Sequence, residues 1–288
     1  MDKKNNIHVR RLEENIFKSL MVFSTGAIVL ALALILWTVI RKGLPHLSLG
    51  MLTQAPKSGY YLGKDGGILN AILGSLYLTG GAALLAILVS LPVVLYLNVY
   101  LKKGSPLAYI ARFSFDILWG IPSIVYGAFG FTIMLLFGVK SSLLGGMIAV
   151  TFLIFPIMSR SMDEVVRMVP GELMDASYAL GATKLETAFK VVVRQALPGI
   201  STAVLISFGR GIGDAASLIF TAGFTDSLPT SLLAPAATLP LAIFFQFGTP
   251  MPEVQGRAYA SALTLTLIIL VISVAARLLT RKFTKHVV

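Results

Sequence analysis

The chain has 288 residues, of which 56% are hydrophobic and only 13% are charged. Its mean hydropathy is +0.83, whereas a soluble domain carries about 25% charged residues, so this composition excludes an ordinary soluble domain and predicts one membrane domain over residues 1–288. The net charge of +11 comes from Lys and Arg at the ends of apolar segments, an arrangement that argues against a nucleic-acid-binding stripe. The absence of Cys excludes disulfides and thiolate sites, and the three His residues are too far apart in sequence to predict a metal site.

Six segments are long and apolar enough to cross about 30 Å of hydrocarbon as helices of about 20 residues. The first is too long for the core of a signal peptide and is predicted to be a retained anchor. Gly80, Gly81 and Pro92 predict a tilt or break in the second segment, and Pro122 and Pro156 fall inside the third and fourth. The six predicted spans are residues 16–40, 69–99, 114–138, 141–160, 199–222 and 259–280.

A seventh apolar stretch, residues 228–247, lacks charge but contains Pro229, Pro235 and Pro240. Three prolines are too many for a simple lipid-facing helix. With six spans, most Lys and Arg residues and both termini lie on the cytoplasmic side, whereas a seventh crossing would move the basic C-terminus outside, against the positive-inside rule. The prediction is therefore an all-α bundle of six transmembrane helices with cytoplasmic termini, and a re-entrant or surface-lying segment 228–247 on the outer face.

The polar loop 161–198 between the fourth and fifth spans contains the signals of two short helices. Pro170 suits the first turn of a helix, and the acidic residues Glu172 and Asp175 lie near its positive end. Gly181 can end this helix in the left-handed conformation.

A second helix is predicted to open at Thr183, because Thr183 and Glu186 have the spacing of a capping box. It is predicted to run to about Ala196 and to stop at Leu197-Pro198. The pair of helices could be an ordinary hairpin that links two spans. The alternative is a docking element, in which Leu173 and Leu180 are apolar anchors and the small residues Ala176, Ser177 and Ala179 let a helix sit deep in a partner's groove.

Residues 169–184 and 191–200 resemble the EAA loop of ABC importer permeases, in which this loop is the coupling helix that docks on the cytoplasmic ATPase. The acidic-Ala-Ala triplet of that family corresponds to Asp175, Ala176 and Ser177, and its glycine corresponds to Gly181. The resemblance implies a set of ATPase-coupling residues: Glu172, Asp175, Ala176, Ser177, Gly181 and Thr183.

Three further segments, residues 66–75, 118–127 and 210–221, resemble the PstA family of permeases of phosphate ABC importers. The family pattern continues through Pro156, Arg160 and Glu164. The chain departs from it in the predicted pore region, where Asp214 replaces Glu, Ala215 replaces Thr, Ser217 replaces Pro, and Asn98 stands where an acidic residue is common. The resemblance implies a multi-pass permease subunit in the cytoplasmic membrane of a bacterium that moves phosphate.

Arg210 and Asp214 are predicted to lie within the fifth span, four residues apart and on one helical face. A charge at mid-membrane costs about 2.5–3.5 kcal/mol on insertion scales, and an Arg–Asp pair offsets part of that cost. One interpretation is therefore structural. The other is that Arg210, Asp214 and Arg160 line or gate the translocation path, with Arg210 offering its donors to an oxyanion.

The sequence contains no ATP-binding signature and no catalytic constellation, so no enzymatic activity and no cofactor is predicted for this chain. The resemblance implies a second, PstC-like permease subunit, two PstB-like ATPase subunits that hold ATP and Mg²⁺, and an external PstS-like phosphate-binding protein. The outer segments 41–68 and 223–258 are the candidates for docking that binding protein. The alternatives are an ABC permease for another oxyanion, such as molybdate or sulfate, and a self-sufficient secondary transporter or channel, which would carry inverted repeats.

Overall fold

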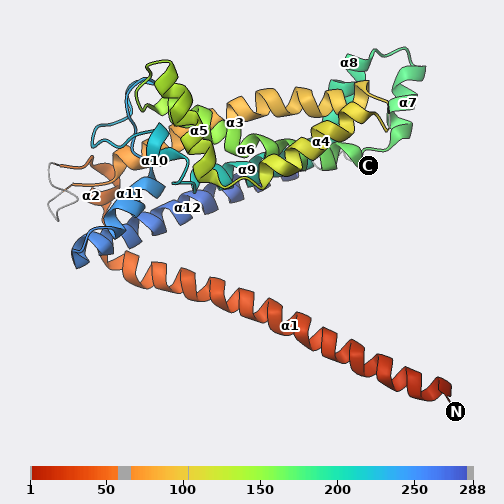
Figure 1. The fold of residues 1–288 in the computed structure, drawn as a ribbon, viewed down its shortest axis with the longest axis horizontal. Coiled ribbons are helices and arrows are strands. Elements are labelled where there is room, and N and C mark those ends of the chain that lie inside the picture. The colour runs from red at the N-terminus through yellow and green to blue at the C-terminus, as the bar shows by residue number, and fades with distance from the viewer. Residues whose placement is uncertain (1, 58–65, 103, 284–288) are drawn as a thin grey trace.

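The computed structural model describes residues 2–57, 66–102 and 104–283, and within these residues it is helical without a strand (Figure 1). A 3₁₀ turn at Leu44–His46 follows the first helix, and two π-helical segments, Tyr96–Tyr100 and Thr187–Val192, extend longer helices. The helices are α1 (Asp2–Gly43), α2 (Leu49–Thr53), α3 (Leu69–Leu95), α4 (Pro106–Trp119), α5 (Ser123–Leu136), α6 (Leu143–Arg167), α7 (Gly171–Ala179), α8 (Lys184–Glu186), α9 (Val193–Ile212), α10 (Leu218–Thr221), α11 (Leu239–Phe247) and α12 (Pro252–Phe283).

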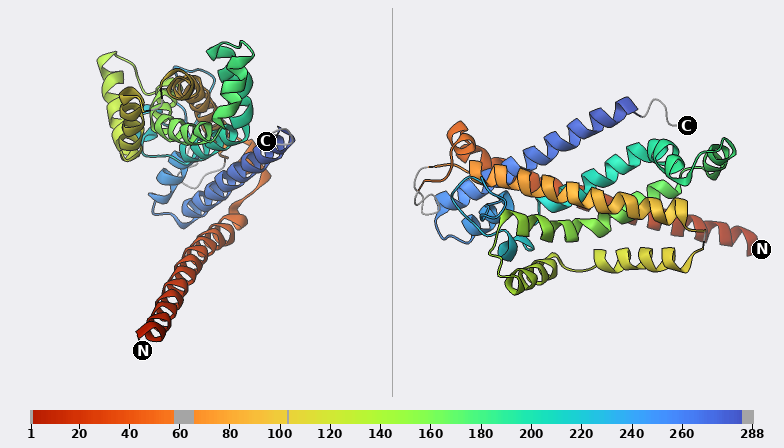
Figure 2. Two further views of the ribbon diagram at one scale, coloured as in Figure 1. Left: turned by 90° about the vertical axis from the view of Figure 1, so that its right-hand side faces the viewer. Right: turned by 90° about the horizontal axis from the view of Figure 1, so that it is seen from above.

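Helix α6 forms the centre of the bundle, because it packs against both α3 and α9 (Figure 2). Its inward face is fully buried at Val150, Ile154 and Met158. Without a hydrophobic driving force between helices in lipid, such packing depends on close approach at small residues. Gly146 and Gly211 provide it: a Cβ at Gly146 would lie 2.7 Å from Leu78 Cδ1, and one at Gly211 would lie 3.0 Å from Val150 Cγ1.

The predicted six-span bundle agrees with the structure, which has five helices long and apolar enough to cross a membrane and one bent pair that can form a sixth span. The five helical segments are Arg10–His46, Leu69–Tyr100, Leu143–Arg167, Lys184–Ile212 and Pro252–Leu278. The second of them runs through Gly80, Gly81 and Pro92 without a break in the helix. Pro156 likewise lies inside an unbroken α6.

The predicted third span is wrong as a single helix. It consists of α4 and α5, which are bent by 100° at the break between Trp119 and Ser123. Pro122 supplies no N–H donor and disfavours helical geometry at the residue before it, so a helix cannot continue through this point. The hydroxyl of Tyr126 donates to the carbonyl of Leu118 at 2.7 Å and satisfies an acceptor at the end of α4.

The predicted boundary between the cytoplasmic helix and the fifth span is also wrong. The helix that begins at Lys184 continues through the π-helical segment and through Pro198 to Ile212. A proline inside a membrane helix is tolerated where neighbouring helices cover the freed backbone. Gly199 allows that contact, because a Cβ there would overlap with the side chain of Val165 in α6.

The helix within the stretch 228–247 is the nine-residue α11, which is too short to cross a membrane, so the prediction that this stretch does not span is confirmed. The chain from 222 to 238 closes one end of the bundle through backbone bonds from Ala236 to Ala222 and from Leu143 to Ala234. The N–H of Leu239 donates to Ser75 Oγ at 2.8 Å, which fixes the start of α11 against α3. Its residues Leu239 and Leu241 are fully buried.

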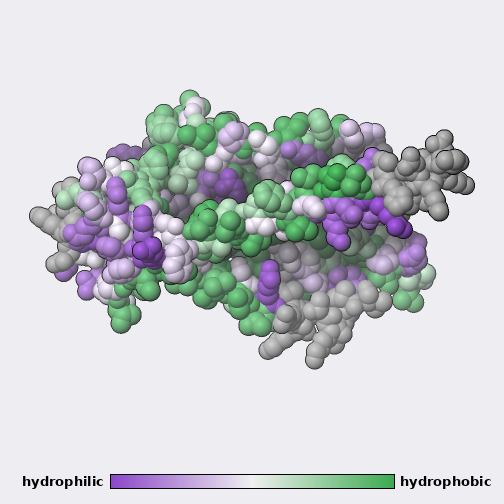
Figure 3. Space-filling model, turned by 90° about the horizontal axis from the view of Figure 1, so that it is seen from below, coloured by the Kyte–Doolittle hydropathy of each residue, from purple (hydrophilic) through white to green (hydrophobic). Residues whose placement is uncertain are grey.

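The two ends of the bundle are named by their helices: the α7 end carries α7 and α8, and the α11 end carries α2, α10 and α11 (Figure 1). Both ends of the described chain lie on the side of the α7 end, as an even number of crossings requires. Hydrophobic residues cover the middle of the bundle, and hydrophilic residues gather mostly toward its two ends (Figure 3).

Helix α1 stands off from the rest of the bundle (Figure 2). Its contact with α12 lies near its C-terminal end, where a Cβ at Gly43 would lie 2.6 Å from the carbonyl oxygen of Tyr259. No residue in the most apolar part of its membrane-spanning segment is buried. Large apolar side chains along it are exposed, and Phe23, Ile28 and Trp37 are each more than half exposed, so within this chain α1 is available to lipid or to a partner.

Candidate coupling and gating sites

Helix α7 projects from the α7 end and buries none of its residues. Pro170 is its N-cap residue and Glu172 lies in its first turn, where the helix dipole favours negative charge. The helix ends before Gly181, whose φ of +83° is the predicted left-handed conformation. A Cβ at Gly181 would meet no atom within 4 Å, so the turn requires glycine for its backbone angle and not for space.

The predicted capping box is present at the start of α8. Thr183 Oγ1 accepts from the N–H of Glu186, and the Glu186 carboxylate accepts from the N–H of Thr183 at 3.1 Å. Lys190 contacts the same carboxylate at 2.9 Å. These local bonds satisfy the orphan donors of the first turn and fix the angle at which the chain leaves the Gly181 turn.

One side-chain bond ties α7 to the helix that follows it. Ser177 Oγ lies 2.9 Å from Thr187 Oγ1, and Thr187 is fully buried. The other predicted coupling residues Glu172, Asp175, Ala176, Gly181 and Thr183 are exposed. Beside them, Leu180 is 89% exposed and Met168 is 80% exposed, which leaves apolar side chains on a surface that the described residues do not cover.

Arg210 and Asp214 form an ion pair, but the prediction that both lie on one helical face is wrong. Helix α9 ends at Ile212, so Arg210 lies in its last turn and Asp214 lies beyond it. Arg210 Nη1 lies 3.1 Å from Asp214 Oδ1. The second carboxylate oxygen accepts from the N–H of Ser217 at 2.9 Å and from the Ser217 hydroxyl. Asp214 therefore caps the turn that leads into α10.

The two partners of this pair differ in burial and in the number of bonds that hold them. The Asp214 side chain is 3% exposed and has three bonds, whereas the Arg210 side chain is 45% exposed and bonds to Asp214 through one nitrogen. The turn is held by α5, because a Cβ at Gly127 would lie 2.7 Å from the carbonyl oxygen of Ser217. Asp214 is thus fixed in place, while the Arg210 guanidinium has donors directed to no other described residue.

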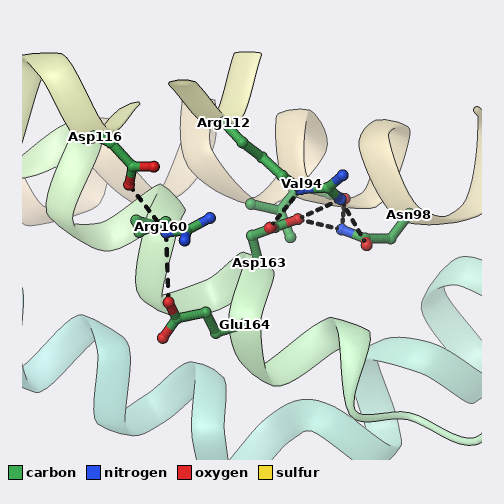
Figure 4. Close-up of polar contacts among 7 residues, drawn as sticks. All are labelled: Val94, Asn98, Arg112, Asp116, Arg160, Asp163 and Glu164. Carbon is green, nitrogen blue, oxygen red and sulfur yellow. Dashed lines mark hydrogen bonds and ion pairs between the residues drawn. The ribbon is translucent and has the colours of Figure 1, made fainter. Parts of the chain in front are cut away.

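Arg160 lies on α6 between two carboxylates (Figure 4). Its Nε is 3.1 Å from Asp116 Oδ1 in α4 and 3.4 Å from Glu164 Oε1 one turn further along α6. Asp116 therefore pairs with Arg160 of α6 and not with Arg112, which lies four residues earlier in α4. Asp116 and Glu164 are 50% and 62% exposed, so this three-residue group lies at a surface of the chain.

A second polar group, which the sequence did not predict, joins α3, α4 and α6 (Figure 4). Asp163 is fully buried and accepts from Arg112 Nε at 2.7 Å, from Arg112 Nη2 at 3.0 Å and from Asn98 Nδ2 at 2.7 Å. Arg112 Nη2 also donates to Asn98 Oδ1 at 3.2 Å. Asn98 lies in the π-helical segment Tyr96–Tyr100 after α3. Its departure from the family pattern was the one sequence signal that pointed here.

The predicted site residues fall into separate places. The coupling residues lie at the α7 end, and the continuous helix from Lys184 carries Arg210 roughly 40 Å away at about 1.5 Å per residue. Arg160 lies on α6, apart from both the coupling residues and the Arg210–Asp214 pair. Of Gly209, Gly211 and Gly213, which surround Arg210, Gly211 alone packs tightly against neighbouring helices. Among the described residues no group of three or more His, Cys, Asp and Glu could hold a metal ion.

Comparison with known proteins gives concordant matches. The family model described as binding-protein-dependent transport system inner membrane component matches residues 91–285. The chain is similar to the phosphate transport system permease protein PstA of Haemophilus influenzae, with 33% identity over 244 residues that cover 85% of each chain. It is 30% identical over 273 residues to PstA 1 of Mycobacterium tuberculosis, covering 94% of this chain and 89% of that one.

A solved structure supports the fold. The chain superposes on an inward-facing structure of the MetNI methionine ABC transporter with a TM-score of 0.61, covering 75% of this chain and 96% of that one. The sequence identity of that pair is 19%, so the likeness concerns the arrangement of helices.

Proposed function

The chain belongs to the family of binding-protein-dependent transport system inner membrane components, and we propose that it is the permease subunit of an ATP-driven phosphate importer. The observation that carries the proposal is the 30–34% identity to proteins named phosphate transport permeases over most of this chain. The family is one of transport components, and the long apolar helices agree with a multi-pass membrane protein. The cytoplasmic membrane of a bacterium is the proposed location.

The proposed energy source is a separate ATPase subunit that docks on α7 and the Gly181 turn. Support comes from the surface itself: no residue of α7 is fully buried, its small residue Ala176 is exposed, and Leu180 and Met168 present apolar side chains beside it. A helix with a small exposed face can enter a groove, and the neighbouring apolar side chains can fill pockets of that groove. ATP and Mg²⁺ would be held by this partner, with no cofactor in the permease.

The helix that starts at Lys184 offers a route for motion between the two ends. The Ser177–Thr187 bond joins α7 to it, and it continues without interruption to Arg210 in the last turn of α9. A push on α7 would therefore move one rigid element whose other end carries the Arg210–Asp214 pair. If this helix can take up two positions, and if the docking site and the gate both favour one of them, the two sites are energetically coupled.

We propose that Arg210 and Asp214 are a gate of the translocation path. Asp214 is fixed by Ser217, while Arg210 is half-exposed and holds Asp214 through a single nitrogen. A guanidinium in this position can exchange a carboxylate for a phosphate oxyanion, because both accept charge-assisted bonds from it. Weak, exchangeable binding suits a permease, which must release its cargo.

Arg160 is proposed as a second element of this path. Its contacts to Asp116 in α4 and Glu164 in α6 tie the two helices together at an exposed surface. Because exposed ion pairs contribute about 0–1 kcal/mol, such a link can break and re-form as the helices move.

The proposed assembly contains a second, PstC-like permease subunit, two PstB-like ATPases and an external PstS-like phosphate-binding protein. The unpaired apolar surface of α1 supports the need for a neighbouring membrane subunit. Segments 41–68 and 223–258, whose described residues lie at the α11 end opposite α7, are the proposed docking region for the binding protein.

Uptake of radiolabelled phosphate tests the cargo. Cells that lack this chain are expected to lose high-affinity phosphate uptake and to regain it when the chain is supplied from a plasmid. Excess molybdate or sulfate is added as a competitor in parallel. Phosphate uptake that is the same with and without the chain, together with uptake of labelled molybdate or sulfate that requires the chain, would assign the cargo to another oxyanion and refute the phosphate proposal.

A further inference from the structure

A cavity of about 390 Å³ lies at the α7 end, outside both groups of residues in the proposed transport mechanism. Its wall is formed by the π-helical segment Tyr96–Tyr100 and the chain that follows it, by α4, by the last turn of α6 and by the first turns of α7. The cavity is thus located where three membrane helices meet the projecting helix.

The charged lining of this cavity is basic. Lys102, Arg112 and Arg167 line it from three different elements, and no Asp or Glu is among the described lining residues. The carboxylate of Asp163 does not line the cavity and accepts three hydrogen bonds from Arg112 and Asn98. Asn98 also lines the cavity, and its amide is neutral. A carboxylate at that position would have offset part of the positive charge of the lining.

Arg112 is held in a fixed orientation at the cavity wall. Its Nε and Nη2 bond to Asp163 and Asn98, which leaves Nη1 as the guanidinium nitrogen without a partner among the described residues (Figure 4). The side chains of Lys102 and Arg167 are exposed. The ammonium group of Lys102 has three N–H donors, and the guanidinium of Arg167 presents its donors in a planar fork. One oriented donor and two adaptable ones are a suitable set for a tetrahedral oxyanion.

The remaining lining is largely apolar and includes Leu101, Val169 and Met174. A cavity that combines basic side chains with an apolar wall, at the ends of membrane helices, has the composition of a site for a lipid headgroup. The same donors would also accept a free phosphate ion.

We propose that this cavity binds a phosphate group, supplied by an anionic phospholipid headgroup or by inorganic phosphate, and that the bound group ties α7 to α4 and α6. The proposal concerns a site at the opposite end of the molecule from Arg210 and does not depend on the identity of the transported cargo. Occupancy would hold the position of α7 relative to the bundle.

The test uses the purified full-length chain and the double variant Lys102→Gln with Arg167→Gln. Both side chains are exposed, so the variant is expected to fold, as judged by its elution in detergent. Arg194→Gln is the matched control, because Arg194 is exposed on α9 near the same end but does not line the cavity. The single variants Lys102→Gln and Arg167→Gln are measured as well and serve if the double variant does not fold.

In the lipid arm, native mass spectrometry measures retention of phosphatidylglycerol and cardiolipin against phosphatidylcholine. In the ion arm, thermal stability is followed in inorganic phosphate against chloride at matched ionic strength. Each removed charge is expected to weaken binding of the phosphate group by about fivefold, in the lipid arm for a headgroup or in the ion arm for free phosphate.

Loss of binding in the double variant with retention in Arg194→Gln supports the site, and the arm that responds identifies the source. The proposal is overturned if neither arm distinguishes the double variant from the unaltered chain. It is also overturned if Arg194→Gln loses as much binding as the double variant, because the attraction would then come from surface charge in general.

Discussion

The fully buried carboxylate of Asp163 in α6 accepts two hydrogen bonds from the Arg112 guanidinium in α4, at 2.7 Å and 3.0 Å. The two residues are 51 positions apart in the chain. A bidentate pair of this kind fixes both the distance and the rotation between two helices. It joins α4 to α6 close to the turn that precedes α7.

Asp163→Ala is expected to destabilise the chain by about 3 kcal/mol, because it leaves the charge of Arg112 without its partner in a partly buried position. The thermal midpoint of the full-length chain in detergent measures the loss. Glu164→Ala is the control: that neighbouring carboxylate is 62% exposed and its removal should cost less than about 1 kcal/mol. Equal losses in the two variants would show that the Arg112–Asp163 pair does not hold the helices together.

Gly181→Val is expected to reduce coupled phosphate uptake by a factor of about 5–30 while the chain still inserts into the membrane. The φ of +83° at this position costs an L-residue about 1–2 kcal/mol, so valine would shift the exit of α7. Gly171→Ala is the control, because Gly171 has no positive φ and a Cβ there meets no atom. Gly181→Asn should retain more uptake, since Asn tolerates the left-handed region. Normal uptake in Gly181→Val would argue against α7 as the docking helix.

Asp214→Asn is expected to disturb phosphate transport or to allow leak, with a normal amount of chain in the membrane. The amide keeps an oxygen that can accept from the Ser217 N–H but removes the charge that pairs with Arg210. Asp214→Ala removes both, and loss of the cap should cost about 1 kcal/mol in addition. Uptake and membrane content are measured together for both variants. A purely structural role predicts the opposite pattern, in which Asp214→Ala loses protein and Asp214→Asn transports normally.

Thr183→Ala is expected to weaken the first turn of α8 by about 1 kcal/mol, because the hydroxyl that accepts from the Glu186 N–H is removed. Hydrogen exchange of the backbone amides at 184–187 should become about fivefold faster through local opening. Thr202→Ala is the control, since the Thr202 hydroxyl donates to the carbonyl of Pro198 within a helix and caps no terminus. Unchanged exchange at these amides would mean that the capping box does not limit local opening.

Several features could be predicted from the sequence because their causes are local. The length of an apolar run decides whether a helix can cross hydrocarbon, so the bundle and its six crossings followed directly. The Gly181 turn and the Thr183–Glu186 capping box were predicted for the same reason: a left-handed glycine and a reciprocal cap are formed by residues within a few positions of each other.

The effect of each proline on its helix could not be predicted from the local sequence. Pro122 breaks the helix between α4 and α5, whereas Pro92, Pro156 and Pro198 lie inside helices. The covalent effect of proline is the same at all four positions, but its result depends on the neighbours that cover the freed backbone. At Pro198 the close contact of Gly199 with Val165 of α6 accompanies the continuous helix, and that contact is tertiary.

The partners of the charged residues were likewise decided by the tertiary structure. In the sequence, Arg112 and Asp116 lie near the start of the predicted span 114–138, and Arg160 and Asp163 lie near the end of the predicted span 141–160. Their positions along the chain could not say that Arg112 pairs with Asp163 and Arg160 with Asp116. The sequence by itself determined an all-helical membrane bundle with a capped, exposed helix, because backbone satisfaction in lipid and local caps act along the chain. Which charges meet, and where the helix carrying Arg210 ends, followed only from packing between segments far apart in sequence.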